Sequence, residues 1–336
     1  MSDTGVLAHV RGAGALAVLV ADPLVSDVLV NGPRDVWVDR GRGLERVECD
    51  VGDVRALAVR LAAVGGARLD DAAPVADARL PDGTRLHAVL PPVAADGAVV
   101  SLRTLRRRAF ALDELVGAGS VHPAAADLLR GLVERRANVL VTGGTGTGKT
   151  TLLASVLSLV PASERIVCIE EAVELAPDHP HVVHLAARRP NVEGAGEIGP
   201  AALVRHALRM RPDRIVLGEA RGGEVREVLT ALNTGHEGGW ATVHANAVAD
   251  LPARLEALGA LAGLDRAAVA AQATSALDAV VHLRREGPRR WVAEVGAVIR
   301  GAVDGWTVEP VLTVDVRGTP VTGPGWRAFV QRWSGP

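Results

Sequence analysis

The stretch VTGGTGTGKTT, residues 141–151, decides the fold of this 336-residue chain. Gly143, four intervening residues, Gly148, Lys149 and Thr150 match the phosphate-binding loop pattern. The apolar run NVLV precedes this loop, and the helix-forming run TTLLASVLSLV follows it, as the pattern requires. The stretch therefore predicts a nucleotide site between a strand and a helix of an α/β fold.

Lys149 is the only lysine among 37 basic residues, and all the others are arginines. A lysine ammonium is a compact point charge, whereas the arginine guanidinium is a planar fork. A chain that uses arginine everywhere else keeps lysine at the one position where arginine would not serve. This bias supports a specific role for Lys149.

The predicted loop suits a triphosphate with Mg²⁺. Its glycines let backbone N–H groups turn inward around phosphate oxygens, and the following helix adds a favourable dipole. Lys149 is expected to reach the β- and γ-phosphates, and the Thr150 hydroxyl to be a Mg²⁺ ligand. The predicted nucleotide-binding residues are Gly143, Gly144, Thr145, Gly146, Thr147, Gly148, Lys149, Thr150 and Thr151.

The rest of the chain reads as two domains and a tail. Residues 1–108 contain short alternating segments separated by the turn signals NGP and PDG, which predict an α+β module with a small antiparallel sheet. Residues 109–300 alternate between strand and helix, which predicts a mostly parallel sheet covered on both faces. Residues 301–336 are expected to be a tail, either a short β addition or a docking element.

Composition excludes several classes of protein. The net charge of −2 and the aromatic share of 2% argue against a nucleic-acid partner, which would require basic grooves and stacking platforms. The two cysteines, Cys49 and Cys168, lack metal spacing, so no zinc is expected. No apolar run has the length of a membrane span and no signal peptide is recognisable, so we expect a cytoplasmic location.

Acidic residues and a histidine follow three further apolar runs. In RPDRIVLGEARGGE, Glu219 ends a strand and is expected to orient or deprotonate the attacking water; the alternative is a helix cap. In RIVCIEEAVEL, Glu170 and Glu171 are candidates to polarise water or hold the metal, although one of them could simply face solvent. In NTGHEGGWATVHAN, His236 or His244 could sense the γ-phosphate.

The order of these motifs resembles the type II/type IV secretion ATPase superfamily, and most closely its CpaF-like Tad/Flp pilus branch. The motifs are the phosphate loop, IEEAVEL, RRPNVEGAGEI, ALRMRPDRIVLGEARGGE and TGHEGGWATVHAN, preceded by DVLVNGPRDVWVD and VSLR. By this resemblance, Lys149 and Thr150 belong to the Walker A loop and Glu219 to an atypical Walker B strand. Glu170 and Glu171 stand in the Asp box, and His244 in the His box. Glu171 departs from the usual aspartate, so either acid of the pair is a candidate.

The resemblance also implies an architecture and a partner. A RecA-like ATPase domain would follow a PAS-like amino-terminal domain that closes over ATP and Mg²⁺ in a hexameric ring. Arginines would complete the site, with Arg85 and Arg103 ranked above Arg188, and Arg221 last. The chain would power Tad/Flp-type pilus assembly or related secretion beside a polytopic platform protein at the inner membrane. The alternatives are a nucleic-acid or conjugation-associated motor, and a nucleotide-binding regulator without turnover.

Overall fold

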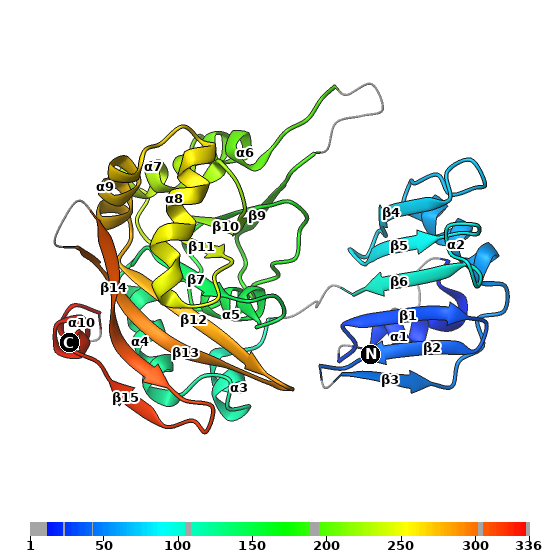
Figure 1. Ribbon diagram of the computed structural model, residues 1–336, viewed down its shortest axis with the longest axis horizontal. Helices are drawn as coiled ribbons and strands as arrows, with labels where there is room; N and C mark the ends of the chain where they lie inside the picture. The colour runs from blue at the N-terminus through cyan, green and yellow to red at the C-terminus, as the bar shows by residue number, and fades with distance from the viewer. Residues whose placement is uncertain are drawn as a thin grey trace. The chain divides into compact units, whose positions relative to one another are not determined.

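The computed structural model describes residues 12–22, 24–41, 43–104, 109–188, 195–301 and 305–333. The chain divides into two compact units, Met1–Arg107 and Arg108–Pro336, called unit 1 and unit 2 below. Figure 1 shows that each unit is built around its own sheet. Residues 105–108, where the sequence predicts the boundary between domains, lie outside the described residues.

Unit 1 is a six-stranded sheet in the order β3-β2-β1-β6-β5-β4, in which neighbouring strands run antiparallel. Alternate residues of β1 and β2, such as Val28 and Val36, are buried in its core together with Leu57 and Leu61 of α2. Helix α2 starts where Asp53 accepts the Ala56 N–H at 3.0 Å, a helix cap. The elements of unit 1 are η2 (Gly14–Leu16), α1 (Ala17–Ala21), β1 (Asp27–Gly32), β2 (Asp35–Asp39), β3 (Leu44–Val47), α2 (Val54–Val64), β4 (Val75–Arg79), β5 (Arg85–Val89) and β6 (Val99–Arg103).

Unit 2 is a nine-stranded sheet in the order β15-β14-β13-β12-β7-β11-β10-β8-β9. The strands from β12 to β9 are parallel, and β13, β14 and β15 continue the sheet antiparallel. Its strands are β7 (Val139–Gly143), β8 (Ile166–Glu170), β9 (Val182–Ala186), β10 (Arg214–Ala220), β11 (Trp240–Val243), β12 (Ala279–Glu286), β13 (Arg289–Arg300), β14 (Trp306–Val314) and β15 (Pro320–Thr322). Its helices are α3 (Leu112–Gly117), α4 (Pro123–Glu134), α5 (Lys149–Leu157), α6 (Pro200–Ala207), α7 (Glu224–Asn233), η3 (Val248–Asp250), α8 (Leu251–Leu261), α9 (Arg266–Ala276) and α10 (Trp326–Trp333).

Helices cover both faces of this sheet (Figure 1). One buried cluster joins the sheet to α3, α4, α5 and α10, and a second joins it to α6, α7, α8 and α9. The predicted α/β class with a mostly parallel sheet is therefore confirmed, and β13, β14 and β15 make the sheet mixed. Residues 306–322, placed by the sequence in a tail, pair with β13 as β14 and β15. No helix in the described part of the chain is long and apolar enough to cross a membrane.

The central strand β7 is fixed at its start by the buried side chain of Asn138. Its Oδ1 accepts the Gly239 N–H at 3.0 Å, and its Nδ2 donates to Ala276 O at 2.7 Å. The Asn138 N–H donates in turn to Asp278 Oδ2 at 2.9 Å. These bonds tie β7 to the segments leading into β11 and β12, the strands on either side of it. The loop at the end of β7 is thereby held in register with its neighbours.

Candidate functional site

The phosphate loop lies between β7 and α5, as the sequence predicts. Gly146 and Gly148 have φ values of +71° and +97°, in the left-handed region that glycine adopts without strain. Gly143 has a φ of +148°, and a Cβ there would stand 2.6 Å from Leu283 O and 2.8 Å from Thr147 Oγ1. Thr147 Oγ1 donates to Gly144 O at 2.9 Å and braces the turn. The loop therefore needs glycine at these positions for backbone and packing reasons.

Lys149 lies at the first position of α5, with its side chain folded over the loop. Its Nζ donates to Gly143 O at 2.9 Å and to Gly144 O at 3.0 Å. Burial lowers the pKa of Lys149, and the nearby Glu219 carboxylate acts in the opposite direction. The ammonium thus sits at the mouth of a glycine-rich loop at a helix N-terminus, an arrangement suited to a phosphate chain. Thr150, the candidate Mg²⁺ ligand, is the next residue of α5 and is half-buried.

Arg221 connects two of the predicted carboxylates. Its guanidinium donates to Glu219 Oε2 at 2.7 Å and to Glu171 Oε2 at 3.0 Å. Glu219 lies on β10 and Glu171 directly follows β8, the strand paired with β10. The sequence ranks Arg221 last among the candidate arginines, yet the structure places it between two predicted acids. These acids and their cation form one charged group at the carboxyl ends of parallel strands.

Glu170 has a different environment from its neighbour Glu171. It is buried, and its Oε1 accepts the N–H groups of Glu174 at 2.8 Å and Leu175 at 2.9 Å. Its Oε2 lies 3.5 Å from His184 Nδ1. The carboxylate therefore holds the turn after β8, while Glu171 is exposed beside Arg221. Of the two acids, the geometry favours Glu171 as the one that faces the site.

His244 follows β11, which lies between β7 and β10. Val243, the residue before it, pairs with Thr142 on one side and with Ala220 on the other. This register brings His244 to the same edge of the sheet as the phosphate loop and Glu219. His236 lies before β11, and its Nδ1 is buried without a hydrogen-bond partner in the described part of the chain. The sheet therefore places His244, rather than His236, among the other site residues.

The candidate arginines of unit 1 are direct neighbours on its sheet. Arg85 of β5 pairs with Arg103 of β6, and Arg79 of β4 pairs with Arg85. Directly opposed residues point to the same side of a sheet, so the three guanidinium groups share one face. Arg103 Nε also donates to Asp27 Oδ1 at 3.0 Å. Arg85 and Arg103 are predicted from the sequence, whereas Arg79 joins them only through the pairing of β4 with β5.

Arg188, the remaining candidate, belongs to a local turn of unit 2. Its Nε donates to Gly196 O at 2.6 Å, and its backbone forms an isolated bridge with Ile198. Residues 189–194 of the motif RRPNVEGAGEI lie outside the described residues. The contacts of Arg188 therefore explain the shape of its own turn.

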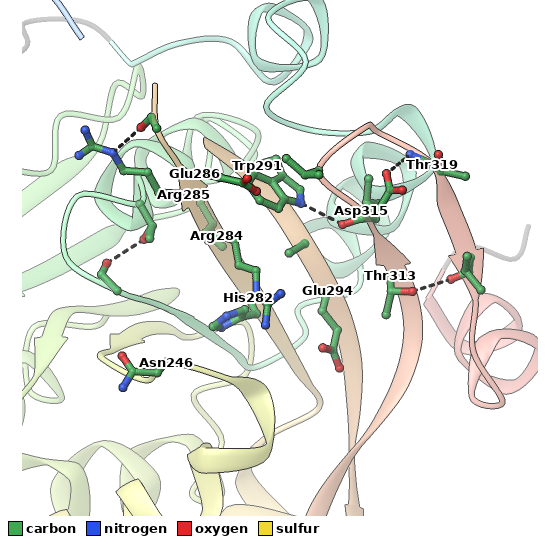
Figure 2. A pocket seen from close by; sticks show the side chains of 18 of the residues that line it. Asn246, His282, Arg284, Arg285, Glu286, Trp291, Glu294, Thr313, Asp315 and Thr319 are labelled. Atoms are coloured by element: carbon green, nitrogen blue, oxygen red, sulfur yellow. Dashed lines mark hydrogen bonds between the residues drawn. The ribbon is translucent and has the colours of Figure 1, made fainter. Parts of the chain in front are cut away.

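A pocket of about 1100 Å³ extends from the phosphate loop along the hairpin formed by β12 and β13 (Figure 2). This pocket was not predicted from the sequence. The run RREGPRR, residues 284–290, has an apolar segment before it and another after it, which is the pattern of a hairpin with an arginine-rich turn. Figure 2 shows His282 and Arg284 beside Glu294, and Asn246 on the loop after β11. The pocket is therefore lined by charged and polar groups together with apolar side chains such as Trp291 and Val314.

A polar row crosses the sheet at this pocket, and three of its residues, His282, Glu294 and Thr313, line the pocket. Thr142, His282, Glu294 and Thr313 are paired from strand to strand. The Thr142 hydroxyl is hydrogen-bonded to His282 Nδ1 at 2.8 Å. Burial, together with the charge of Arg284, lowers the pKa of His282 to about 4, so its imidazole is neutral at pH 7. Burial raises the pKa of Glu294, and Arg284 opposes this shift.

Comparison with known proteins places the chain in a family. Residues 10–290 match the family described as "Type II/IV secretion system protein". A putative conjugal transfer protein of Mycobacterium tuberculosis strain H37Rv is 53% identical over 319 residues, which cover 90% of each chain. The type IV secretion system protein PtlH of Bordetella pertussis is 32% identical over 304 residues, covering 81% of this chain and 89% of PtlH.

A solved structure has a similar fold. The ATPase DotB of Legionella pneumophila superimposes with a TM-score of 0.59 and 19% identity, covering 85% of this chain and 80% of DotB. This likeness supports the α/β fold described above. The family match spans most of the chain, including the phosphate loop, Glu219 and His244. The chain therefore belongs to the type II/IV secretion system protein family.

Proposed function

We propose that this protein is a Mg²⁺-dependent ATPase that acts as the motor of a secretion or pilus-assembly apparatus. The observation that carries the proposal is the phosphate loop with Lys149 folded over it, beside Glu219 and Glu171 at the ends of β10 and β8. A cation poised for phosphate and a carboxylate near it are what phosphoryl transfer to water requires. A nucleotide-binding regulator without turnover would need only the cation that binds phosphate.

In this proposal the chain's own residues divide the work. The loop amides of residues 144–149 and the Lys149 ammonium would bind the phosphates, and Thr150 would hold Mg²⁺ together with phosphate oxygens. Among the described residues no group of three or more His, Cys, Asp or Glu side chains is arranged to hold a metal ion alone. The bound Mg²⁺ would neutralise charge that develops on the phosphates. Glu219 would orient the attacking water and take up its proton, and His244 would sense the γ-phosphate.

The proposal assigns the arginines of unit 1 to the same reaction. Arg85 and Arg103 lie side by side on a sheet face away from the buried residues of β5 and β6. Cations that arrive when a domain closes stabilise a transition state more than the ground state. We assign this role to Arg85 and Arg103 within a hexameric ring. Hydrolysis would then be coupled to movement of unit 1, which is the motion that a motor needs.

The finer proposal is a CpaF-like motor of a Tad/Flp-type pilus, working at the inner face of the cell membrane with a polytopic platform protein. The motif order quoted above supports it. The second candidate is an ATPase of a conjugation apparatus, which is favoured by the name of the 53% identical relative. Deleting the gene separates the two, because loss of surface pili without loss of DNA transfer supports the first, and the reverse supports the second.

The activity itself is tested by phosphate release from ATP in the presence and absence of Mg²⁺. We expect turnover that requires Mg²⁺ and is abolished in Lys149→Ala, together with nucleotide binding, because the loop loses its only ammonium. A suitable control is Arg289→Gln, which removes an exposed cation of the β12–β13 hairpin. Release that continues undiminished in Lys149→Ala would refute the proposed site.

A further inference from the structure

The hairpin of β12 and β13 forms the outer wall of the phosphate loop. A Cβ added to Gly143 would meet Leu283 O, and one added to Gly148 would lie 3.9 Å from both Leu283 Cδ2 and Arg290 Cδ. A Cβ added to Gly146 would lie 3.0 Å from Arg285 Nη1. The hairpin therefore stands close to three glycines of the loop, although more than a hundred residues separate the two segments along the chain.

A hydrogen bond joins the hairpin to Gly146, which is called the crown of the loop below. The Nε–H of Arg290 donates to Gly146 O at 2.8 Å. Arg290 lies near the start of β13, so its backbone is held by antiparallel pairing with β12, where Arg285 is its partner. The donor, Arg290, is thus fixed on a strand, whereas the acceptor, Gly146, lies in the loop and has a positive φ.

The direction of this bond decides which role Arg290 can have. A loop that turns its N–H groups inward around an anion turns carbonyl oxygens outward. Arg290 reaches the Gly146 carbonyl from the β12–β13 hairpin, whereas Lys149 reaches the carbonyls of Gly143 and Gly144 from α5, so we take Arg290 to act on the loop from outside the phosphate cradle. Donation to a carbonyl oxygen polarises its peptide group and strengthens the N–H on the other side, here that of Thr147. Both effects favour the conformation that binds phosphate.

We infer that Arg290 is a positioning residue for phosphate binding, which holds the crown of the loop at Gly146 so that the β12–β13 hairpin sets the affinity of the site for nucleotide. This inference rests on the proposed function, since it concerns the same nucleotide. It differs from the role given to Arg85 and Arg103, because a positioning residue acts before nucleotide arrives. The truncation of Arg290 should therefore weaken binding without slowing the chemical step.

The test compares Arg290→Gln, Arg290→Lys and the control Arg289→Gln in the full chain. Binding of MgADP and MgATP is measured by calorimetry, and kcat by phosphate release at saturating ATP. We expect Arg290→Gln to raise the Kd of both nucleotides about tenfold and leave kcat within about twofold, since a charge-assisted hydrogen bond is lost. Arg290→Lys keeps the positive charge and a donor, so its Kd should lie between that of the wild type and that of Arg290→Gln. Arg289→Gln should match the wild type.

A second measurement does not depend on turnover. In the protein without nucleotide, hydrogen exchange of the amides of residues 144–148 should be faster in Arg290→Gln than in the wild type and in Arg289→Gln. Unchanged Kd and unchanged exchange would overturn the inference. So would a fall in kcat with unchanged Kd, because it would make Arg290 a catalytic cation.

The same series separates this inference from the proposed function. If Lys149→Ala abolishes MgADP binding while Arg290→Gln binds normally, only the role of Arg290 fails. If Lys149→Ala binds MgADP like the wild type, the nucleotide site itself is wrongly assigned. Arg290 is only partly buried at the end of a hairpin, so its truncation leaves the apolar clusters of unit 2 intact.

Discussion

Arg221 donates to Glu219 Oε2 at 2.7 Å, so the carboxylate expected to handle water is held by a guanidinium two residues along the chain. The same guanidinium donates to Glu171, which means that two acids share one cation. A shift of Arg221 toward Glu171 would release Glu219 without leaving the guanidinium unpaired.

The first prediction concerns Glu219. The variant Glu219→Gln should bind MgATP like the wild type but hydrolyse it about 10² times more slowly, because it loses the proton acceptor. Calorimetry and phosphate release measure the two quantities. Glu171→Gln, which affects the shared cation but not the acceptor, should be less impaired. A slower Glu170→Gln or Glu171→Gln with intact binding would invert this assignment.

The lone lysine gives the second prediction. Lys149→Arg keeps the positive charge, yet it should lose most nucleotide binding and turnover, because a planar guanidinium cannot occupy the place where Nζ meets both Gly143 O and Gly144 O. Titration with MgADP and phosphate release test this. If Lys149→Arg turned over ATP at nearly the wild-type rate, the argument that Lys149 stands where arginine would not serve would be wrong.

The third prediction tests whether Arg85 acts across a subunit boundary. Arg85→Ala should still bind ATP and form oligomers but lose most hydrolysis, since a supplied arginine is worth roughly 10³ in rate. Rings that mix Arg85→Ala with Glu219→Gln should recover activity, because some interfaces would pair an intact arginine with an intact glutamate. No recovery in rings shown to contain both variants would mean that Arg85 acts within its own chain, or not at all.

A stability effect is expected at Gly218. A Cβ there would stand 2.8 Å from Glu170 Cγ, so Glu170 would have to move away from the N–H groups of Glu174 and Leu175. Gly218→Ala should lower the free energy of unfolding by about 1–3 kcal/mol, measured by urea denaturation. The control is Gly117→Ala in α3, where an added Cβ meets nothing within 4 Å. Equal stability of the two variants would contradict the crowding at Gly218.

The fifth prediction is a dependence of stability on pH. The pKa of His282 is about 4 in the folded protein, because of burial and Arg284, and near 6.5 when unfolded. Between these values the unfolded chain binds more protons, so the contribution of His282 falls as the pH is lowered from 6.5 toward 4. At pH 5 the loss amounts to roughly 2 kcal/mol relative to pH 7.

The variant His282→Gln isolates this effect. Urea denaturation at pH 7 and pH 5 should show a smaller drop in the free energy of unfolding for the variant than for the wild type, by roughly 2 kcal/mol. The difference between the two pH values removes any constant cost of the substitution itself. An equal drop in the free energy of unfolding in the two proteins would mean that His282 is protonated at pH 5 in the folded state as well.

The phosphate loop and the layered α/β architecture of unit 2 were within reach of the sequence because their signals are local. Glycine spacing, the apolar strand before it and the helix after it are all found within residues 138–160. The same holds for β1 and β2 of unit 1, which are separated by the NGP turn. Periodicity and turn chemistry act over a few residues, so a single sequence displays them.

The remaining features depend on contacts that no local pattern encodes. Successive residues of an extended chain point to opposite sides, so Glu170 at the end of β8 and Glu171 just after it are expected to face different ways, but which of them faces the site depends on how β8 packs. The bond from Arg290 to Gly146 joins positions 144 residues apart. The sequence could not rank Arg221 among the candidate arginines by its charge, because its position between Glu219 and Glu171 depends on the pairing of β8 with β10.

The order of strands in unit 2 also bears on how the chain acquires its shape during synthesis. β7 pairs with β11 and β12, both of which are translated long after it, and the cluster around α5 includes Phe329 and Trp333 of α10. Unit 1, by contrast, draws its core from residues that precede position 103. Domains commonly fold as they leave the ribosome, and distant pairings form late. We therefore expect the phosphate loop, which is translated before β11 and β12, to reach its working conformation only after these strands have been made.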